Sequence, residues 1–540
     1  MHMYLVLVGG LLAAAWIAYL FKKYNIEAIS AKEYAAAAVF FMALLFWFMG
    51  ITGVLQSGYH FVDDHEVYTI GRDLSEYGFW TTMYKWISGD LHQRFRFTYF
   101  LIRVTECYFF GDNFMLWHVF QTFTAAAGLF LSYVFARKMK CTVLEAYIFA
   151  VMIYVGAGQS AVWWRLGPQE NLGTILFMLT LLSLRSYLNK NKVVNLILSI
   201  VLTILLGGIK ESFLLLLPLL PIWITYWDIR QSGQAVNWHN LWSAVKKRWI
   251  YFATVFLVFI IDLGIIILYV GTNKIGYAGI DTSYGIVDFL KGILGIVRGR
   301  ISLYIIATII GVLFLVVPIC ISWIREQHRL LCFVPDIIIP VLSFGYFLGV
   351  QFILHAKGGM YERYLLPTTI AFACFWLVDM NGFIRLRGKY AGRYYLFIVL
   401  MAAVLFQGVN DEERARDYAE DGINTTAMLS KVAEYAEEMP NVLVGIEYEQ
   451  DFSASAYLQE KCNISSTYNL SYSVREDDMV RDGYICSDGE QVTISLYDIQ
   501  IFMGYPHILT PIMDEYGISQ QDFDIYTYGN YVLYVRLAWN

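Results

Sequence analysis

The sequence predicts an α-helical polytopic membrane protein with a small α/β domain at its C-terminus. Of its 540 residues, 58% are hydrophobic and only 16% are charged, whereas soluble domains carry about 25% charged residues. Apolar runs of about 20 residues recur along the first three quarters of the chain, and each is long enough to cross a bilayer. The final quarter is polar and acidic instead.

The charge is divided unevenly along the chain. From Asp411 to the C-terminus there are 24 acidic and 7 basic residues, a formal charge of −17, while the remainder carries +11. Such a division predicts two bodies. We expect a transmembrane domain over residues 1–409 and a soluble α/β domain over residues 410–540, on the outer side of the membrane.

About twelve membrane spans are expected from the apolar runs. Lys and Arg cluster after every second run, which by the positive-inside rule places the large polar loop 56–112 outside. In that loop, segments 67–77 and 95–110 mix aromatic and charged residues, as helices along a membrane interface do. The expected spans are 3–21, 34–55, 114–135, 143–162, 172–187, 193–208, 213–227, 250–270, 301–324, 336–354, 365–378 and 395–407.

The acidic tail alternates helical and strand patterns. A helical period covers 412–439 and a short helix covers 451–460, while 441–446 reads as a buried strand. Segments 491–501 and 524–537 alternate with the strand period, and Gly529-Asn530 interrupts the second as a hairpin turn would. Cys462 and Cys486 are the two cysteines of the tail, and they either pair or remain free thiols.

Four consecutive polar residues stand seven residues after the run 34–55, namely Asp63, Asp64, His65 and Glu66. Carboxylates at this depth can face water and still touch the head group of a lipid, and ionisable residues at membrane depth are usually functional. Taken alone, an acid pair after a helix is more often a solvated loop. His65 is expected to be a hydrogen-bonding neighbour, because no second histidine stands at metal-ligand spacing, and no metal or other cofactor is expected.

The other outer loops supply cations. An acid pair opposite several cations fits a reaction on a phosphate-bearing lipid, in which the cations hold the phosphate and a carboxylate takes a proton from an acceptor hydroxyl. Alternatively, Lys210 and Glu211 are a simple ion pair, and Arg363 and Tyr364 are interfacial anchors. The candidate residues of these loops are Arg94, Arg96, Arg165, Glu170, Lys210, Glu211, Lys357, Tyr361, Glu362, Arg363 and Tyr364.

Three segments carry a family resemblance. Gly358-Gly-Met-Tyr-Glu-Arg-Tyr-Leu-Leu-Pro367 resembles the Arg-Tyr-Leu-Leu-Pro signature of GT-C membrane glycosyltransferases, in their protein O-mannosyltransferase and aminoarabinose-transferase-like branch. Trp164-Arg-Leu-Gly-Pro-Gln-Glu170 and Ile209-Lys-Glu-Ser-Phe213 resemble segments of bacterial cell-surface-glycan members. The resemblance covers roughly residues 34–380. The chain departs from the commonest pattern by its Asp-Asp in place of Asp-Glu and by an extra first helix.

The resemblance implies a polyprenyl-phosphate sugar donor and transfer with inversion. It implies Asp63 as general base, with Asp64 orienting the acceptor or supporting the base. The remaining roles that it implies divide into donor binding by Arg94, Arg96, Arg165, Glu170, Lys210, Glu211, Tyr361, Arg363 and Tyr364, and support by His65, Glu66, Lys357 and Glu362.

The expected function is therefore a glycosyltransferase of the bacterial cytoplasmic membrane. It would move a hexosyl or pentosyl group to a cell-surface glycan, polymer or lipid, with no nucleic acid as partner. The alternative is a transporter or flippase of lipid-linked glycans, which would more often show inverted repeats, and the sequence shows none. A structural or sensor protein leaves the acid pair and the outer cations unexplained.

Overall fold

The computed structural model forms two compact units. The first unit comprises Met1–Phe48, Lys85–Leu101 and Gln121–Glu412, and the second comprises Met49–Tyr84, Ile102–Phe120 and Glu413–Asn540. The structure describes residues 8–12, 15–16, 19, 30–91, 94–154, 161–190, 192–231, 234, 237–269, 287, 290–291, 294, 346, 362–374, 391–439, 441–447, 451–470, 482–484, 491–493 and 496–537.

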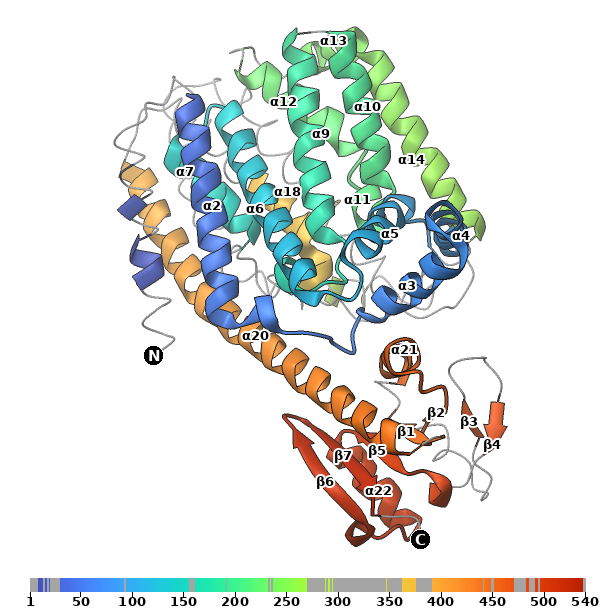
Figure 1. The fold of residues 1–540 in the computed structure, drawn as a ribbon. Helices are drawn as coiled ribbons and strands as arrows, with labels where there is room; N and C mark the ends of the chain where they lie inside the picture. Colours follow the sequence, from blue (N-terminus) through green and yellow to red (C-terminus); the bar gives the residue numbers. More distant parts are fainter. Residues whose placement is uncertain are drawn as a thin grey trace. The chain divides into compact units, whose positions relative to one another are not determined.

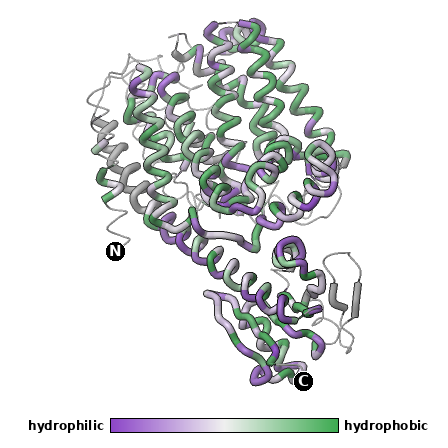
Figure 2. The backbone as a smooth tube through the Cα atoms, viewed as in Figure 1, coloured by the Kyte–Doolittle hydropathy of each residue, from purple (hydrophilic) through white to green (hydrophobic). Residues whose placement is uncertain are grey.

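The first unit is built of helices (Figure 1). Four described helices are long and apolar enough to cross a membrane, and their tubes are mostly green in Figure 2. They are α2 (Ala31–Thr52), α6 (Phe114–Lys138), α9 (Glu170–Lys190) and residues Trp249–Leu268 of α14 (Trp249–Tyr269). The shorter apolar helices α7 (Val143–Tyr154) and α10 (Val193–Gly207) accompany them. These helices indicate a membrane protein.

The predicted number of spans stays a prediction. Segment 301–324 lies outside the described residues, as do all of 336–354 except residue 346, most residues of 3–21 and part of 365–378. The first residue of segment 365–378 is the last residue of η3 (Glu362–Leu365), and the segment continues as α18 (Leu366–Cys374). Segment 395–407 lies within α20 (Ala391–Glu438).

The predicted helix over 213–227 is wrong as one continuous element. The chain forms a short α11 (Glu211–Leu214), a turn, and then α12 (Leu219–Gln231), which is followed by α13 (Trp238–Lys247). Pro218 and Pro221 explain the break, since proline lacks the N–H of a helix interior and clashes with the preceding turn. The turn leaves Lys210 and Glu211 at the start of a one-turn helix.

Polar side chains join neighbouring helices of the first unit. Ser183 of α9 and Ser199 of α10 are hydrogen-bonded at 2.9 Å, and Thr203 of α10 bonds the Tyr251 hydroxyl of α14 at 3.1 Å. Small hydroxyl side chains between helices are typical of membrane bundles, where they let backbones approach and satisfy each other's polar groups.

A buried ion pair joins α2 to α6. Arg137 donates to both carboxylate oxygens of Glu33, at 2.6 and 3.1 Å, and to the carbonyl of Cys141. The Tyr133 hydroxyl donates to Glu33 at 2.7 Å. Both charged side chains of the pair are fully buried, so Arg137 is part of the helix packing as well as of the basic cluster that ends α6.

The loop 56–112 folds into helices. After η1 (Val54–Gln56) come α3 (His65–Tyr77), α4 (Phe79–Leu91) and α5 (Phe97–Phe110). Helices α3 and α5 agree with the predicted segments 67–77 and 95–110, whereas α4 was not predicted. Large aromatic side chains on α4 and α5 are strongly exposed, including Trp80 at 80% and Phe109 at 69%. Exposed aromatic clusters mark interaction surfaces, and here they agree with helices that lie along a membrane interface.

The tail contains a five-stranded sheet in the order β2-β1-β5-β7-β6. Strands β1 (Val444–Ile446), β2 (Thr467–Asn469) and β5 (Ile501–Gly504) are parallel, and β6 (Phe523–Tyr528) and β7 (Tyr531–Arg536) form an antiparallel hairpin. The helices of the tail are the end of α20, α21 (Asp451–Cys462) and α22 (Pro506–Glu515). A separate pair, β3 (Asp482–Tyr484) and β4 (Gln491–Thr493), completes the strands that are described.

Most predicted tail elements are confirmed, including both helices, β1 and the hairpin that turns at Gly529-Asn530. The single strand over 491–501 is wrong. It is divided into β4, the 3₁₀ turn η6 (Leu496–Asp498) and the start of β5. Leu496, Ile499 and Ile501 are all buried, but they do not belong to one strand. The alternation of apolar and polar residues does not show whether such buried residues lie on one strand or on several short elements.

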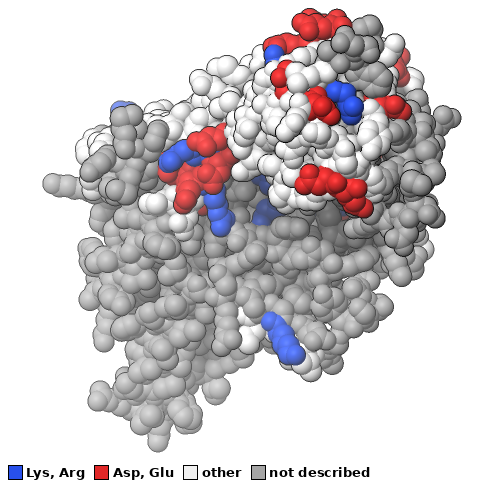
Figure 3. Space-filling view, turned by 90° about the horizontal axis from the view of Figure 1, so that it is seen from below, with Lys and Arg blue, Asp and Glu red and all other residues white. Residues whose placement is uncertain are grey.

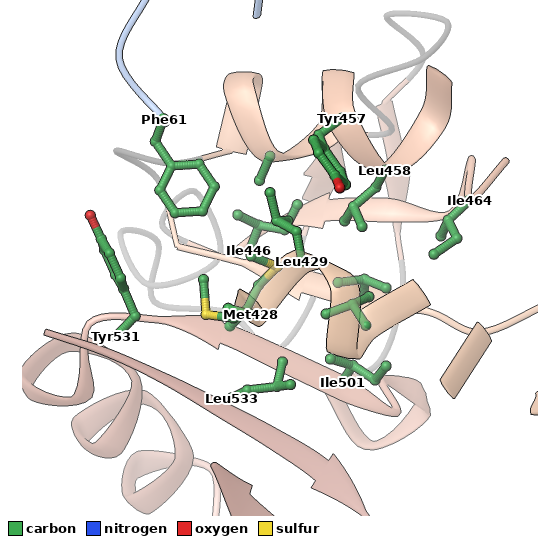
Figure 4. Packing of buried hydrophobic residues seen from close by; sticks show 14 of the residues in the cluster. Phe61, Met428, Leu429, Ile446, Tyr457, Leu458, Ile464, Ile501, Tyr531 and Leu533 are labelled. Atoms are coloured by element: carbon green, nitrogen blue, oxygen red, sulfur yellow. The ribbon is translucent and has the colours of Figure 1, made fainter. Parts of the chain in front are cut away.

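The core of the second unit includes residues of the loop 56–112. Tyr59, Phe61 and Tyr68 are buried in one cluster with residues of α20, α21 and the sheet. Figure 4 shows Phe61 pointing into this cluster, near Tyr531 of β7, and the two rings meet edge to face at 5.5 Å. A second core, which includes Leu509 and Met513 of α22, lies on the other face of the sheet.

Gly58 allows the loop to approach α20 closely. Its φ is +83°, and a Cβ there would lie 2.4 Å from Thr426 Oγ1. The next residue, Tyr59, donates its backbone N–H to that same oxygen at 2.8 Å. Only glycine supplies both the left-handed backbone and the space.

Acidic side chains are prominent on the described surface in Figure 3.

Candidate active site

The acid pair lies in a tight turn, Phe61–Asp64, directly before α3. Asp63 has a φ of +72° and is half-buried. A left-handed backbone is unusual for a residue other than glycine, although Asp and Asn tolerate it best. Such strain persists only where the surroundings enforce it, and it is concentrated at functional sites.

Hydrogen bonds of the neighbouring Asp64 fix the conformation of this turn. Its carboxylate is fully buried, and Oδ2 accepts the backbone N–H of His60 at 3.0 Å and lies 3.2 Å from Nδ1 of the same residue. The second oxygen, Oδ1, has no hydrogen-bond partner among the described residues. The Asp64 side chain therefore closes the turn that carries Asp63.

His60 connects this turn to α20. Its ring stacks on Tyr418 with centroids 3.7 Å apart, and Nε2 lies 2.9 Å from the Tyr418 carbonyl oxygen. A carbonyl only accepts, so Nε2 carries a hydrogen. Sequence analysis missed His60, because its partner on α20 is 358 residues away.

Replacing His60 by asparagine is expected to loosen the acid turn. Asp64 would remain buried without its ring partner, which costs on the order of 2 kcal/mol. We expect faster hydrogen exchange of the backbone amides of residues 59–66 and a lower unfolding temperature. His65→Asn is the matched control, because His65 lies in the same segment and is half-buried, with its ring Nδ1 3.4 Å from the Ser453 hydroxyl. Equal effects of the two substitutions would contradict the anchoring role of His60.

Glu66 belongs to an ion-pair network between α3 and α5. Arg103 Nε donates to Glu66 Oε2 at 3.0 Å, and its Nη1 lies 3.8 Å from Glu106. The Arg103 guanidinium is buried and lies 4.4 Å from the Trp117 ring centre. One guanidinium thus lies close to two carboxylates, and Glu66 helps to hold α3 at the end of the acid turn.

The buried position of Glu106 predicts that the stability of this unit depends on pH. Burial raises the pKa of Glu106 from 4.5 to about 7, with Glu66 adding to the rise and Arg103 opposing it. A raised folded-state pKa contributes stability that is complete below pH 4.5 and is lost as the pH rises through 7. We expect Glu106→Gln to remove a pH dependence of about 3 kcal/mol, measured by thermal unfolding at a series of pH values. An unchanged slope in the variant would exclude Glu106 as its source.

The first unit brings several candidate residues together. We call the following set the cation cluster: Arg94, Lys210 and Arg363, with Glu170, Glu211 and Tyr364. Lys210 forms a close ion pair with Glu170, the first residue of α9, and both side chains are buried. The Lys210 ammonium also lies 4.5 Å from the ring centre of Tyr364, which is 2% exposed.

Arg94 forms the second ion pair of the cluster. Its Nε and Nη2 donate to the two Glu211 oxygens at 2.8 and 2.7 Å. Burial tends to raise the pKa of Glu211, but the charge and hydrogen bonds of Arg94, helped by Arg96, hold that pKa well below its usual range. Glu211 is therefore ionised and fixes the Arg94 guanidinium in a bidentate geometry.

Backbone contacts hold these segments together. The N–H of Thr98 donates to the carbonyl of Gly208 at 2.9 Å. A Cβ at Gly208 would lie 2.2 Å from the Phe97 ring, so the glycine permits the segment of Arg94 to approach that of Lys210. Arg363 Nη2 lies 3.3 Å from the hydroxyl of its neighbour Tyr364.

Other candidates have separate surroundings. Arg96 binds Asp90 through two donors, at 3.0 and 2.6 Å, and lies over the rings of Tyr99 and Phe100. Arg165 is half-buried, and its carbonyl accepts from Gln121 at 3.0 Å. Lys357 and Tyr361 lie outside the described residues, as does Cys486, and the Glu362 side chain is not described either.

Within the described part of the chain, no three His, Cys, Asp or Glu side chains are grouped so as to hold a metal ion. The prediction that no metal is needed is not tested by this. The sequence matches no protein-family model, and no curated protein matches it. The GT-C resemblance therefore rests on the quoted motifs and stays a prediction.

Proposed function

We propose that this protein is an integral membrane glycosyltransferase. It would move a sugar from a polyprenyl-phosphate donor to a glycan, polymer or lipid of the cell envelope, at the outer face of a bacterial cytoplasmic membrane. The observation that supports this best is the cation cluster, in which three basic residues from distant segments of the chain are buried or half-buried beside two carboxylates and a tyrosine.

The charge of the cluster suits the proposed donor. Among its described side chains, the cations Arg94, Lys210 and Arg363 exceed the carboxylates Glu170 and Glu211 by one positive charge. A sugar joined through phosphate to a polyprenol is a phosphodiester with one negative charge. The two carboxylates orient the cations in advance, which is how preorganised sites stabilise developing charge without reorganisation.

The proposed reaction is a single displacement with inversion. Asp63 takes the proton of an acceptor hydroxyl while the acceptor oxygen forms a bond to the anomeric carbon. The bond from that carbon to the phosphate oxygen breaks, and the electron pair stays on the phosphate. Polyprenyl phosphate leaves with a second negative charge, and the cation cluster stabilises it. Asp64, held by His60, positions Asp63.

The test uses purified wild-type protein in detergent with a panel of radiolabelled polyprenyl-phosphate sugars. Release of polyprenyl phosphate together with a labelled, sugar-bearing product would support the transferase and identify its sugar. If no donor turns over and labelled lipid instead crosses the bilayer of liposomes that contain the protein, the chain is a flippase. Inversion is tested by the anomeric configuration of the product, determined by NMR.

Arg363→Ala is expected to weaken the use of the donor and to leave the use of the acceptor nearly unchanged. Loss of a charge-assisted contact with phosphate costs about 1.5–3 kcal/mol, so the KM for the donor should rise by roughly 10–100-fold. Lys210→Ala should act in the same direction, but it also leaves Glu170 buried without its ion-pair partner, so its unfolding temperature must be measured as well. Equal changes in the donor and acceptor KM values would argue against phosphate binding.

A further inference from the structure

The second unit contains a surface pocket, here called the cavity, which has a volume of about 480 Å³, is partly open to solvent and is not used by the proposed reaction. It lies where α20 and α21 end and where the chain enters β1 and β2. Asn441 and Asn463, which follow the two helices, have φ values of 69° and 56°. Asparagine is one of the few residues that adopt this left-handed conformation readily, and both residues line the cavity.

Four neutral polar residues line the cavity beside the charged Glu437 and Lys461, namely Asn441, Asn463, Ser465 and Ser466. None of these four side chains forms a hydrogen bond within the part of the chain that is described. Amide and hydroxyl groups each donate and accept. A ligand with many hydroxyl groups can therefore bind all four, because it also presents donors and acceptors on the same atoms.

The charges around the cavity disfavour anions. The C-terminal ends of α20 and α21 direct carbonyl groups and partial negative charge toward this region, and the exposed Glu437 adds a carboxylate. The cation in the lining, Lys461, is engaged in a close ion pair with Asp112. Backbone carbonyls at helix ends are acceptors for hydroxyl donors, which again suits a neutral hydroxylated ligand.

The remaining lining is aliphatic. Ala433 and Ala436 of α20 present small side chains next to Met439, Val442 and Ile464. Such a wall suits the C–H face of a sugar ring and leaves its hydroxyl groups for the polar side. Burial raises the pKa of the Cys462 thiol to about 11, so Cys462 is a neutral wall residue and no nucleophile.

We propose that this cavity is a binding site for a neutral carbohydrate of one or two sugar residues. The volume falls in the range of small-ligand pockets, about 300–1,000 Å³. If the protein transfers sugars, the ligand would be part of the acceptor glycan. The site is defined by binding alone, so its test requires no turnover and remains informative if the transferase proposal fails.

The experiment is ligand-observed NMR by saturation transfer, with the full-length protein in nanodiscs. The probes are methyl glycosides and disaccharides of glucose, galactose, mannose, rhamnose and N-acetylglucosamine, with inorganic phosphate as an anionic probe. We expect at least one neutral sugar to bind. We expect Asn463→Gly, which keeps the left-handed backbone, to weaken its binding about tenfold, the effect of losing roughly one hydrogen bond. Ala436→Leu should abolish it by filling the cavity.

Asn530→Gly is the matched control, since it removes the same amide from the β6–β7 turn, outside the cavity lining. Unchanged affinity in this control, with loss in the two cavity variants, establishes the site. The proposal is overturned if no neutral sugar of the panel binds the wild-type protein. It is equally overturned if binding survives in Ala436→Leu or if phosphate competes for the site.

Discussion

Asp63→Asn is expected to lower the rate of sugar transfer by about 10²–10⁴-fold, which is the contribution of a general base. The substitution removes the negative charge that accepts the proton and keeps the size of the side chain. Asparagine is nearly isosteric with aspartate and tolerates the left-handed backbone that residue 63 adopts, with its φ of +72°. The measurement is single-turnover transfer at saturating donor, with the unfolding temperature recorded in parallel.

Glu76→Gln provides the control for this experiment. Glu76 is an exposed acid on α3, near the acid turn in sequence, and its neutralisation should leave the rate unchanged. A rate for Asp63→Asn within a few-fold of wild type would remove Asp63 from the mechanism. Loss of activity together with loss of the fold would instead mean that the turn is structural.

The second large effect is expected from the buried pair of Glu33 and Arg137. Glu33→Gln leaves Arg137, whose side chain is fully buried, without a carboxylate partner. Removing one member of a buried ion pair costs about 3–5 kcal/mol, because the remaining charge has lost its compensation. We expect a clearly lower unfolding temperature in detergent. Lys138→Met, which neutralises the exposed neighbour of Arg137, should have little effect.

The double variant Glu33→Leu/Arg137→Met separates charge from packing. Replacing both members by apolar residues of similar volume is often neutral or stabilising, so the double variant should be more stable than Glu33→Gln. If the double variant were as unstable as the single one, then the pair would matter through its hydrogen bonds to Tyr133 and Cys141 and not through the balance of charge.

Local patterns were sufficient for much of the fold. Apolar runs predicted α2, α6, α9, α10 and α14, because burial in lipid requires a long stretch of apolar residues in one segment. Strand alternation and Gly529-Asn530 predicted the β6–β7 hairpin, since a turn of this type depends on the residues that form it. In segment 213–227 the apolar composition predicted one continuous helix, but two prolines divide the segment between α11 and α12.

The partners of the charged residues were decided by tertiary structure. Lys210 and Glu211 are adjacent in the sequence, which suggested an ion pair between them. In the structure Lys210 forms an ion pair with Glu170, and Glu211 forms one with Arg94. Asp64 binds His60, whose ring is held by α20, and Phe61 is buried in the core of the acidic tail. The sequence by itself determined which segments are apolar, helical or extended, because those preferences are local. Which charges meet depends on contacts between residues hundreds of positions apart, and only the folded chain specifies them.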